Sequence, residues 1–175
     1  PSAPFGPRDI KPTPTGGIVV AFGRGRMPVF IDTGLNVVHV DDVAHGHLLA
    51  HAHGVVGERY ILGGDDMSLR DILVTFAAQL GRLPPRIRLP LLPLFPIACA
   101  FEVIGRIARF EPALTLNALR MAKRPMYYSS AKAGRVLGYA PRSGLDALRD
   151  AADWYRDNGY FTDSRECSRV DPDAV

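Results

Sequence analysis

The chain of 175 residues is 47% hydrophobic, which predicts one domain with an apolar core of its own. Its formal net charge of +3 is a mild excess spread along the sequence, so a nucleic-acid-binding protein is not expected. The two cysteines, Cys99 and Cys167, stand far apart without metal-ligand spacing, which is typical of reduced thiols in a cytoplasmic protein. Because the sequence begins with Pro1 and not with Met, we expect a piece of a longer chain.

The N-terminal part of the sequence indicates a loop followed by two short strands. Residues 1–17 contain five prolines and three glycines, and we expect them to form a loop or an extended connection. The runs Val29–Ile31 and Val37–Val40 are rich in β-branched residues and predict short strands.

The segment HVDDVAHGH, residues 39–47, places three histidines and two aspartates within nine residues. His47 and His51 are four apart on an expected helix, but Leu48 stands where a zinc protease would carry its glutamate, so a metal site is not expected. Adjacent aspartates at a helix start point in different directions and do not share a proton. We therefore interpret the segment as a strand-to-helix turn, with Asp41 or Asp42 as the N-cap of a helix that ends near residue 53.

The next elements are a short strand and the clearest helix of the chain. The apolar run 59–62 predicts a buried strand. Ser68 and Asp71 have the spacing of a capping box, and Gly81 ends the helix that follows. The apolar face of this helix consists of Leu69, Ile72, Leu73, Phe76, Ala77 and Leu80.

The segment 89–101 is strongly apolar and uncharged, but it has only 13 residues and contains three prolines. A membrane-spanning helix needs about 20 apolar residues, so no transmembrane segment is expected. The prolines favour an entry into a buried helix from Ile97. Two alternatives are a polyproline ligand for a partner domain and a membrane-surface segment that uses residues 91–101 with nearby arginines.

Three more helices complete the expected order. A short strand is expected over 86–89, and helices over 112–123 and 130–137. The last helix ends at Asn158-Gly159. Its inward face is expected to consist of Leu145, Leu148, Ala152 and Tyr155.

Five short matches in this order resemble the NAD-dependent epimerase/dehydratase family, the extended short-chain dehydrogenases/reductases. They are Pro1–Asp9, His39–Ala44, Tyr60–Gly64, Ser130–Ala133 with Leu137–Pro141, and Ala152–Tyr155. The run GPRDIKPTPTG, residues 6–16, further resembles the branch of hopanoid-associated sugar epimerases.

The resemblance implies an α/β fold, namely the C-terminal part of a Rossmann-type enzyme with its mostly helical substrate-binding domain. This part is expected to cover residues 1–161, with a late Rossmann strand near 59–63 and a disordered tail over 162–175. The family's GxxGxxG turn and catalytic Tyr-x-x-x-Lys pair are missing, because Gly23-Arg-Gly-Arg has no third glycine and Tyr128 with Lys132 matches the spacing only formally. We expect no catalytic residue here and no activity of this chain alone.

The resemblance also implies where a cofactor and a substrate would bind. NAD or NADP is the expected cofactor, and the cofactor-binding residues implied are Pro1 and Ser2. The substrate-binding residues implied are Phe5, Arg8, Lys11 and Thr13. The other expected partners are the missing N-terminal half and a second copy in a homodimer.

The substrate class is left between a sugar, a nucleotide sugar and an apolar ketone or alcohol. The leading interpretation is a sugar epimerase, dehydratase or reductase that works by hydride transfer. Residues 34–37 lack the arginine that pairs with a sugar-nucleotide diphosphate in the family, which favours a reductase similar to dihydroflavonol or hydroxysteroid enzymes. A non-catalytic binding domain that retains the fold is the alternative from another functional class.

Overall fold

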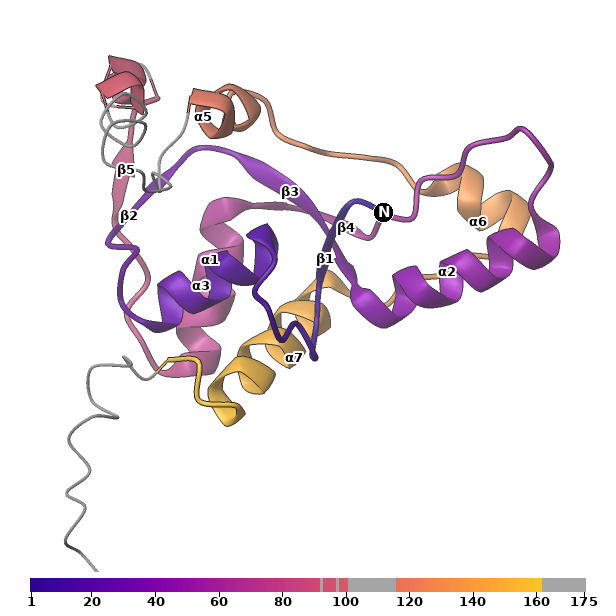
Figure 1. Cartoon of the computed structure of the whole chain (residues 1–175), viewed down its shortest axis with the longest axis horizontal. Coiled ribbons are helices and arrows are strands. Elements are labelled where there is room, and N and C mark those ends of the chain that lie inside the picture. The colour runs from indigo at the N-terminus through magenta and orange to yellow at the C-terminus, as the bar shows by residue number, and fades with distance from the viewer. Residues whose placement is uncertain (92, 97, 101–115, 162–175) are drawn as a thin grey trace, which may run out of the picture.

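The computed structural model describes residues 1–91, 93–96, 98–100 and 116–161 of the chain, which form an α/β fold (Figure 1). The elements in chain order are β1 (Ala3–Phe5), α1 (Pro14–Gly23), β2 (Val29–Ile31), β3 (Gly34–His39), α2 (Val40–His53), β4 (Asp65–Ser68), α3 (Leu69–Leu80), β5 (Ile87–Leu89), α5 (Leu116–Ala122), α6 (Ala131–Leu137) and α7 (Gly144–Asp157).

The described strands form two small sheets. In the first, the order is β1-β3-β4, where β1 pairs with β3 in parallel and β4 pairs with β3 antiparallel. In the second, β2 pairs with β5 in parallel, and Phe30 lies opposite Arg88. The parallel register of Ala3 with Val37 and of Phe5 with His39 brings the N-terminal segment beside the start of α2.

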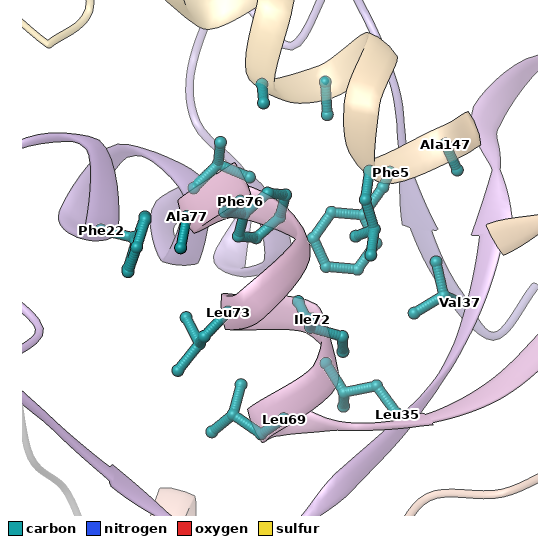
Figure 2. Close-up of a cluster of buried hydrophobic side chains, with 14 of the residues drawn as sticks. Phe5, Phe22, Leu35, Val37, Leu69, Ile72, Leu73, Phe76, Ala77 and Ala147 are labelled. Atoms are coloured by element: carbon teal, nitrogen blue, oxygen red, sulfur yellow. The ribbon is translucent and has the colours of Figure 1, made fainter. Parts of the chain in front are cut away.

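The main core lies between the first sheet and the helices α1, α3 and α7 (Figure 1). Figure 2 shows the ring of Phe76 between those of Phe22 and Phe5. The centroid of the Phe76 ring lies 6.2 Å from that of Phe5 and 6.3 Å from that of Phe22. A smaller cluster of Leu62 with α6 residues and Tyr139 joins α2 to α6. The N-terminal strand is therefore held by aromatic packing from α3.

Helix α3 confirms the prediction made from its local signals. The Ser68 hydroxyl accepts from the Asp71 backbone N–H at 3.1 Å and donates to the Asp71 carboxylate at 2.6 Å. Gly81 ends the helix at φ 63°, in the left-handed region that favours glycine. All six residues of the expected apolar face are at least partly buried.

Helix α1 corrects the expectation that residues 1–17 form only a loop or extended connection. Strand β1 begins at Ala3, and α1 begins at Pro14 after the N-cap Thr13, whose hydroxyl accepts from the backbone N–H of Gly16. Proline is favoured in the first turn of a helix, because backbone N–H groups there have no acceptor within the helix and the N–H that proline lacks is not needed. Gly16 is required by packing, since a Cβ there would lie 2.0 Å from the Tyr155 hydroxyl oxygen.

The strand expected near 59–63 is also corrected. Residues 59–64 have no strand, and the strand that pairs with β3 on the side away from β1 is β4, which begins at Asp65. The apolar run instead buries Leu62 in the smaller core cluster, and the Leu62 carbonyl accepts from the backbone N–H of Ser2. The expected division into 1–161 and a tail stays a prediction.

The remaining expected elements have mixed outcomes. The strands predicted over 29–31 and 86–89 are confirmed as β2 and β5, and the last two helices are confirmed as α6 and α7. On α7, however, Leu145 is 39% exposed, and Ala147 and Ala151 take the inward positions. Residues 94–96 and 98–100 are helical, so the helix predicted from Ile97 is confirmed over its described residues 98–100, and helical residues already precede it. Ile97 itself, the residues from 101 on, the start of the helix predicted over 112–123 and the tail over 162–175 lie outside the described residues.

Candidate functional site

A pocket of about 460 Å³ opens beside strand β1, and we call it the β1–β3 pocket. It is formed by β1, the start of α1, strand β3 and the segment from α5 to residue 128. Its lining residues are Pro1, Ser2, Ala3, Pro4, Thr13, Pro14, Thr15, Leu35, Asn36, Met121, Met126 and Tyr128.

Two polar side chains stand out in the β1–β3 pocket. Asn36 is 1% exposed, and its amide group donates to the carbonyls of Gly64 and Tyr128 and to the carboxylate of Asp66. Its carbonyl oxygen accepts from the backbone N–H of Gly64 at 2.9 Å. Within the described part of the chain, the buried hydroxyl of Ser2 has no hydrogen-bond partner. A buried hydroxyl without a partner is costly, so Ser2 is available to a ligand that enters the pocket.

The rest of the lining of the β1–β3 pocket is uncharged and mostly apolar, with three further hydroxyl groups, those of Thr13, Thr15 and Tyr128. Among the described residues that line it, none is Lys, Arg, Asp, Glu or His. A diphosphate that is buried without a cation loses charge-assisted hydrogen bonds worth about 1.5–3 kcal/mol each. The pocket therefore suits an uncharged, apolar molecule with a few polar atoms.

A second pocket, of about 210 Å³, lies under the loop that joins β1 to α1, and we call it the loop pocket. Its lining residues are Pro4, Phe5, Gly6, Pro7, Arg8, Asp9, Thr13, Gly16, Val19, Val40, Ala151 and Tyr155. The Asp9 carboxylate accepts from the backbone N–H of Thr13 at 2.9 Å, from its hydroxyl at 2.8 Å and from the Tyr155 hydroxyl at 2.6 Å. The Tyr160 hydroxyl donates to the Ile10 carbonyl at 2.6 Å. The loop is thus fixed to α7 through Tyr155 and to the segment after α7 through Tyr160.

Two buried tyrosines differ in whether their hydroxyl has a partner. Burial raises the pKa of Tyr155, and the hydrogen bond to Asp9 and the charge of Asp9 raise this pKa further. Burial also raises the pKa of Tyr139 to about 12, with a smaller contribution from the charge of Asp42. In the described structure, however, the Tyr139 hydroxyl has no hydrogen-bond partner.

This difference predicts opposite effects of the same substitution. Tyr155→Phe should lower the free energy of unfolding by about 1.5–3 kcal/mol, because the Asp9 carboxylate loses a donor. Tyr139→Phe should leave it unchanged or raise it by up to about 1 kcal/mol, because an unsatisfied buried hydroxyl is removed. Urea unfolding at neutral pH measures both, and equal losses in the two variants would contradict the assignment of the Asp9 bond.

The pH dependence has a sign that follows from the Tyr139 pKa. Because the folded pKa of about 12 lies above the ordinary value of 10.0, the folded state resists ionisation of this hydroxyl. Below pH ~10 the hydroxyl is protonated in both states and does not change the free energy of unfolding with pH. As the pH rises from about 10 toward 12, the unfolded state ionises first, so the free energy of unfolding falls. Urea unfolding at alkaline pH should show a smaller loss of stability for Tyr139→Phe than for the unsubstituted protein.

Sequence and structure comparisons place this geometry in a known family. The chain is 41% identical over 165 residues to a putative dihydroflavonol 4-reductase of Synechocystis, covering 91% of this chain and 48% of that protein. It is 30% identical over 163 residues to sterol demethylase protein B of Methylococcus capsulatus, covering 92% of this chain and 50% of that protein. The chain belongs to the extended short-chain dehydrogenase/reductase family, also called the NAD-dependent epimerase/dehydratase family. No protein-family model matches it.

Solved structures agree with this assignment and confirm the expected α/β fold. The crystal structure of gox2253 is 46% identical, with a TM-score of 0.76 and coverage of 93% of this chain and 49% of that one. A nucleoside-diphosphate-sugar epimerase from Pseudomonas aeruginosa is 31% identical, with a TM-score of 0.72 and coverage of 93% and 48%. The chain spans about half the length of the relatives that it matches.

The six site residues implied by the family resemblance fall into three groups. Pro1, Ser2 and Thr13 line the β1–β3 pocket, and Thr13 also lines the loop pocket. Phe5 and Arg8 line only the loop pocket, where the Phe5 ring belongs to the core and is 3% exposed. The exposed Lys11 lines neither of these two pockets. The structure brings Ser2 and Thr13 together but separates them from Lys11.

Arg8 has an unusual backbone and a clear partner. Its φ of 71° makes it the one described residue other than glycine with a positive φ. Its guanidinium group donates to the Asp41 carboxylate at 2.9 Å, and the two side chains are 72% and 45% exposed. A residue in this backbone region is held there by its surroundings. In this case the Asp41 contact and the fixed Asp9 hold it.

The expected N-cap of α2 is wrong. The N-cap is His39, whose Nδ1 accepts from the backbone N–H of Asp41 at 3.1 Å. Because Nδ1 accepts, the ring proton lies on Nε2, which donates to the Asp150 carboxylate at 3.2 Å. Asp41 pairs with Arg8, and Asp42 accepts from the backbone N–H and the side chain of Arg142. The two aspartates tie α2 to other segments and do not cap it.

Tyr128 and Lys132 do not act together in this structure. Lys132 forms an ion pair with Glu58 and lies over the ring of Tyr60 at 4.9 Å from its centroid. The hydrogen bond from Lys132, together with its charge, lowers the pKa of the Glu58 carboxyl group. Tyr128 instead lines the β1–β3 pocket, and its carbonyl accepts from Asn36.

Asn36 and Tyr128 are site residues that the sequence alone did not identify. The available signal for Asn36 was a polar amide within an otherwise apolar strand, since buried amides need several hydrogen-bond partners. Tyr128 has no such signal, because its role depends on the packing of a distant segment against β3 through the Leu35–Met126 bridge. In the described parts of the chain, no helix has the length and apolar content to cross a membrane.

Proposed function

We propose that this chain forms the substrate-binding part of an NAD(P)-dependent oxidoreductase that interconverts a ketone and a secondary alcohol on a flat, apolar substrate. The observation that carries this proposal is the apolar β1–β3 pocket, whose described lining residues include no charged side chain. The relatives named as a dihydroflavonol reductase and a sterol demethylase protein support an apolar substrate.

The residues of the pocket fit one end of a nicotinamide cofactor. The buried and unpartnered hydroxyl of Ser2 can accept from or donate to a carboxamide group. The phosphates of a dinucleotide have no counterpart in the sequence, because it lacks the glycine-rich turn. When bound, NAD or NADP would supply the hydride exchange. The residues of this chain would orient the substrate and exclude water, with Pro1 and Ser2 on the cofactor side.

We propose roles on the substrate side for Phe5, Arg8, Lys11 and Thr13. Thr13 is well placed, because it lines both pockets and its hydroxyl is fixed by Asp9. The buried Phe5 would act through the position of β1, and Arg8 and Lys11 would meet the polar end of a substrate outside the β1–β3 pocket. A polycyclic substrate of hopanoid lipid biosynthesis, a cytoplasmic location and a homodimer belong to the same proposal.

A sugar-nucleotide epimerase or dehydratase is the second candidate. The 31% identity to the nucleoside-diphosphate-sugar epimerase favours it. For such a substrate, Arg8 and Lys11 would have to bind the diphosphate, although Arg8 already pairs with Asp41. The uncharged pocket therefore supports the reductase better.

The deciding experiment uses the full-length protein that contains this sequence. We expect oxidation of NADH or NADPH with dihydroflavonol-like and ketosteroid-like ketones, and no conversion of UDP-sugars. Conversion of a UDP-sugar without turnover of any apolar ketone would establish the epimerase alternative. A full-length protein that neither binds NAD(P)H nor turns over any substrate would establish a non-catalytic binding domain.

This chain alone should bind neither NAD nor NADP. The reason is that the glycine-rich turn and the Tyr-x-x-x-Lys pair of the family are not in its sequence. Titration calorimetry should show no binding with a dissociation constant below about 1 mM, equivalent to about −4.1 kcal/mol. A micromolar constant would place a dinucleotide site within these 175 residues.

The loop charges give a kinetic prediction for the full-length protein. Arg8→Ala and Lys11→Ala should each raise KM for the accepted substrate by about tenfold, which corresponds to the loss of one charge-assisted contact of ~1.4 kcal/mol. NAD(P) affinity and melting temperature should stay nearly constant. Arg59→Ala is the matched control, because Arg59 is exposed and lines neither the loop pocket nor the β1–β3 pocket. An unchanged KM in both loop variants would show that the loop only connects β1 to α1 and does not contact the substrate.

A further inference from the structure

The surface around β2 and β5 combines exposed aliphatic side chains with arginines. Leu83 is 81% exposed and Ile87 is 59% exposed. Arg82, Arg86 and Arg88 flank them in sequence and are also exposed. We call these five residues the β5 surface. Figure 1 shows β2 and β5 at the end of the molecule opposite to α2 and α6.

The β5 surface borders a shallow pocket of about 390 Å³. The pocket is lined by Phe22, Gly25, Met27, Pro28 and residues 82–87. Phe22 closes its floor and is 4% exposed. A Cβ on Gly25 would lie 3.3 Å from a guanidinium nitrogen of Arg82, so the cation lies against this backbone at the pocket rim. The pocket thus has an apolar floor and a cationic rim.

The chain segment that carries this surface has basic residues and no acidic ones, although Asp32 on the neighbouring segment pairs with one of the arginines. The sequence from residue 72 to residue 101 contains Arg82, Arg86 and Arg88 and no Asp or Glu. Arg88 pairs with Asp32 at 2.5 Å, whereas Arg82 and Arg86 form no ion pair with any described residue. A partner with negative charges and an apolar interior would satisfy both kinds of side chain at once.

From these observations we infer that the β5 surface docks the protein onto a membrane that carries anionic lipids. The arginines bind lipid phosphates, and Leu83 and Ile87 enter the boundary between headgroups and acyl chains. Pro84 and Pro85 fix the backbone between the two aliphatic side chains, so little chain entropy is lost on binding. The contact is at the membrane surface, in keeping with the lack of a spanning helix among the described residues.

Charge and exposure decide against a second copy of the chain and against a nucleic acid as the occupant. A second copy of the chain would place arginines against the same arginines in an isologous contact, which is unfavourable without acidic partners. A nucleic acid would meet the arginines but would leave Leu83 and Ile87 without apolar contacts. The proposal is independent of the substrate proposed above, because it rests on a different surface.

Vesicle sedimentation tests the proposal with this chain. We expect binding to vesicles of equal parts phosphatidylglycerol and phosphatidylcholine, weaker binding at high salt, and none to pure phosphatidylcholine. The double variant Arg82→Gln/Arg86→Gln should bind more weakly by about fivefold for each arginine. The double variant Leu83→Asp/Ile87→Asp should abolish binding. Both variants should keep the circular dichroism spectrum, because all four side chains are exposed.

Matched controls make the outcome specific to this surface. Leu48→Asp changes a leucine of similar exposure, 70%, on α2, and Arg59→Gln changes an exposed arginine elsewhere. Both should bind vesicles as the unsubstituted chain does. Equal binding to neutral and anionic vesicles would overturn the proposal, as would undiminished binding of the Leu83→Asp/Ile87→Asp variant. A concentration-dependent dimer that Leu83→Asp dissociates would assign the surface to a second copy instead.

Discussion

Replacing Phe76 by alanine should lower the free energy of unfolding by about 3–5 kcal/mol. Phe76 is fully buried and its ring packs against those of Phe5 and Phe22. Few neighbours can fill the cavity, because the core cluster that contains Phe76 draws its buried residues from six different elements. Chemical unfolding followed by circular dichroism gives this difference directly.

The control for Phe76 lies on the same helix. Val74 is 44% exposed, so Val74→Ala should cost less than about 1 kcal/mol. In the full-length protein, Phe76→Ala should also impair catalysis at temperatures where it stays folded, because Phe5 loses its support and the loop pocket loosens. A loss below 1 kcal/mol in Phe76→Ala would show that this aromatic cluster does not hold β1 in place.

Elements with local signals were predictable from sequence. Helix α3 is specified by its own residues, from the Ser68 and Asp71 cap to Gly81, and its apolar periodicity matches its buried face. Helix α1 is the opposite case. Gly16 and Gly17 lower its intrinsic helix propensity, and the reason for Gly16 is the hydroxyl of Tyr155, far away in sequence. A helix that depends on a distant side chain has no complete signal of its own.

The start of α2 shows how long-range pairs change a local expectation. Aspartate is a preferred N-cap, and the sequence offered two of them. The structure uses His39 because its ring is held by Asp150 on α7, which fixes the tautomer that can accept. Asp41 and Asp42 instead accept hydrogen bonds from Arg8 and Arg142, which are 33 and 100 residues away in sequence. These pairs follow from the fold and have no spacing that a sequence reveals.

The candidate site was predictable only in part. The family resemblance identified the segment from Pro1 to Thr13, and the structure places three of its implied residues at the β1–β3 pocket. The resemblance gave no information on Asn36, whose function is to join three chain segments by hydrogen bonds. Such a role depends on where the backbone carbonyls of residues 64 and 128 lie, and backbone positions have no side-chain signature.

The second large effect is expected at Asn36. Asn36→Ala should lower the free energy of unfolding by about 3 kcal/mol, because the backbone groups of Gly64 and the carbonyl of Tyr128 lose their partner in a partly buried region. Asn158→Ala is the matched control. Asn158 is exposed, and its side chain makes a single bond to the Trp154 carbonyl, so this change should cost less than about 1 kcal/mol.

A conservative variant separates the hydrogen bonds of Asn36 from its volume. Asn36→Asp keeps the shape and the acceptor for the Gly64 N–H, but it places a carboxylate against the Asp66 carboxylate and two carbonyls. If the donor bonds carry the effect, Asn36→Asp should be at least as unstable as Asn36→Ala at neutral pH and should recover as the pH falls and the new carboxyl group becomes protonated. In the full-length protein, both variants should raise KM for the substrate more than for NAD(P)H, because Asn36 shapes the wall of the β1–β3 pocket. Full stability of Asn36→Asp at neutral pH would show that volume alone matters at this position.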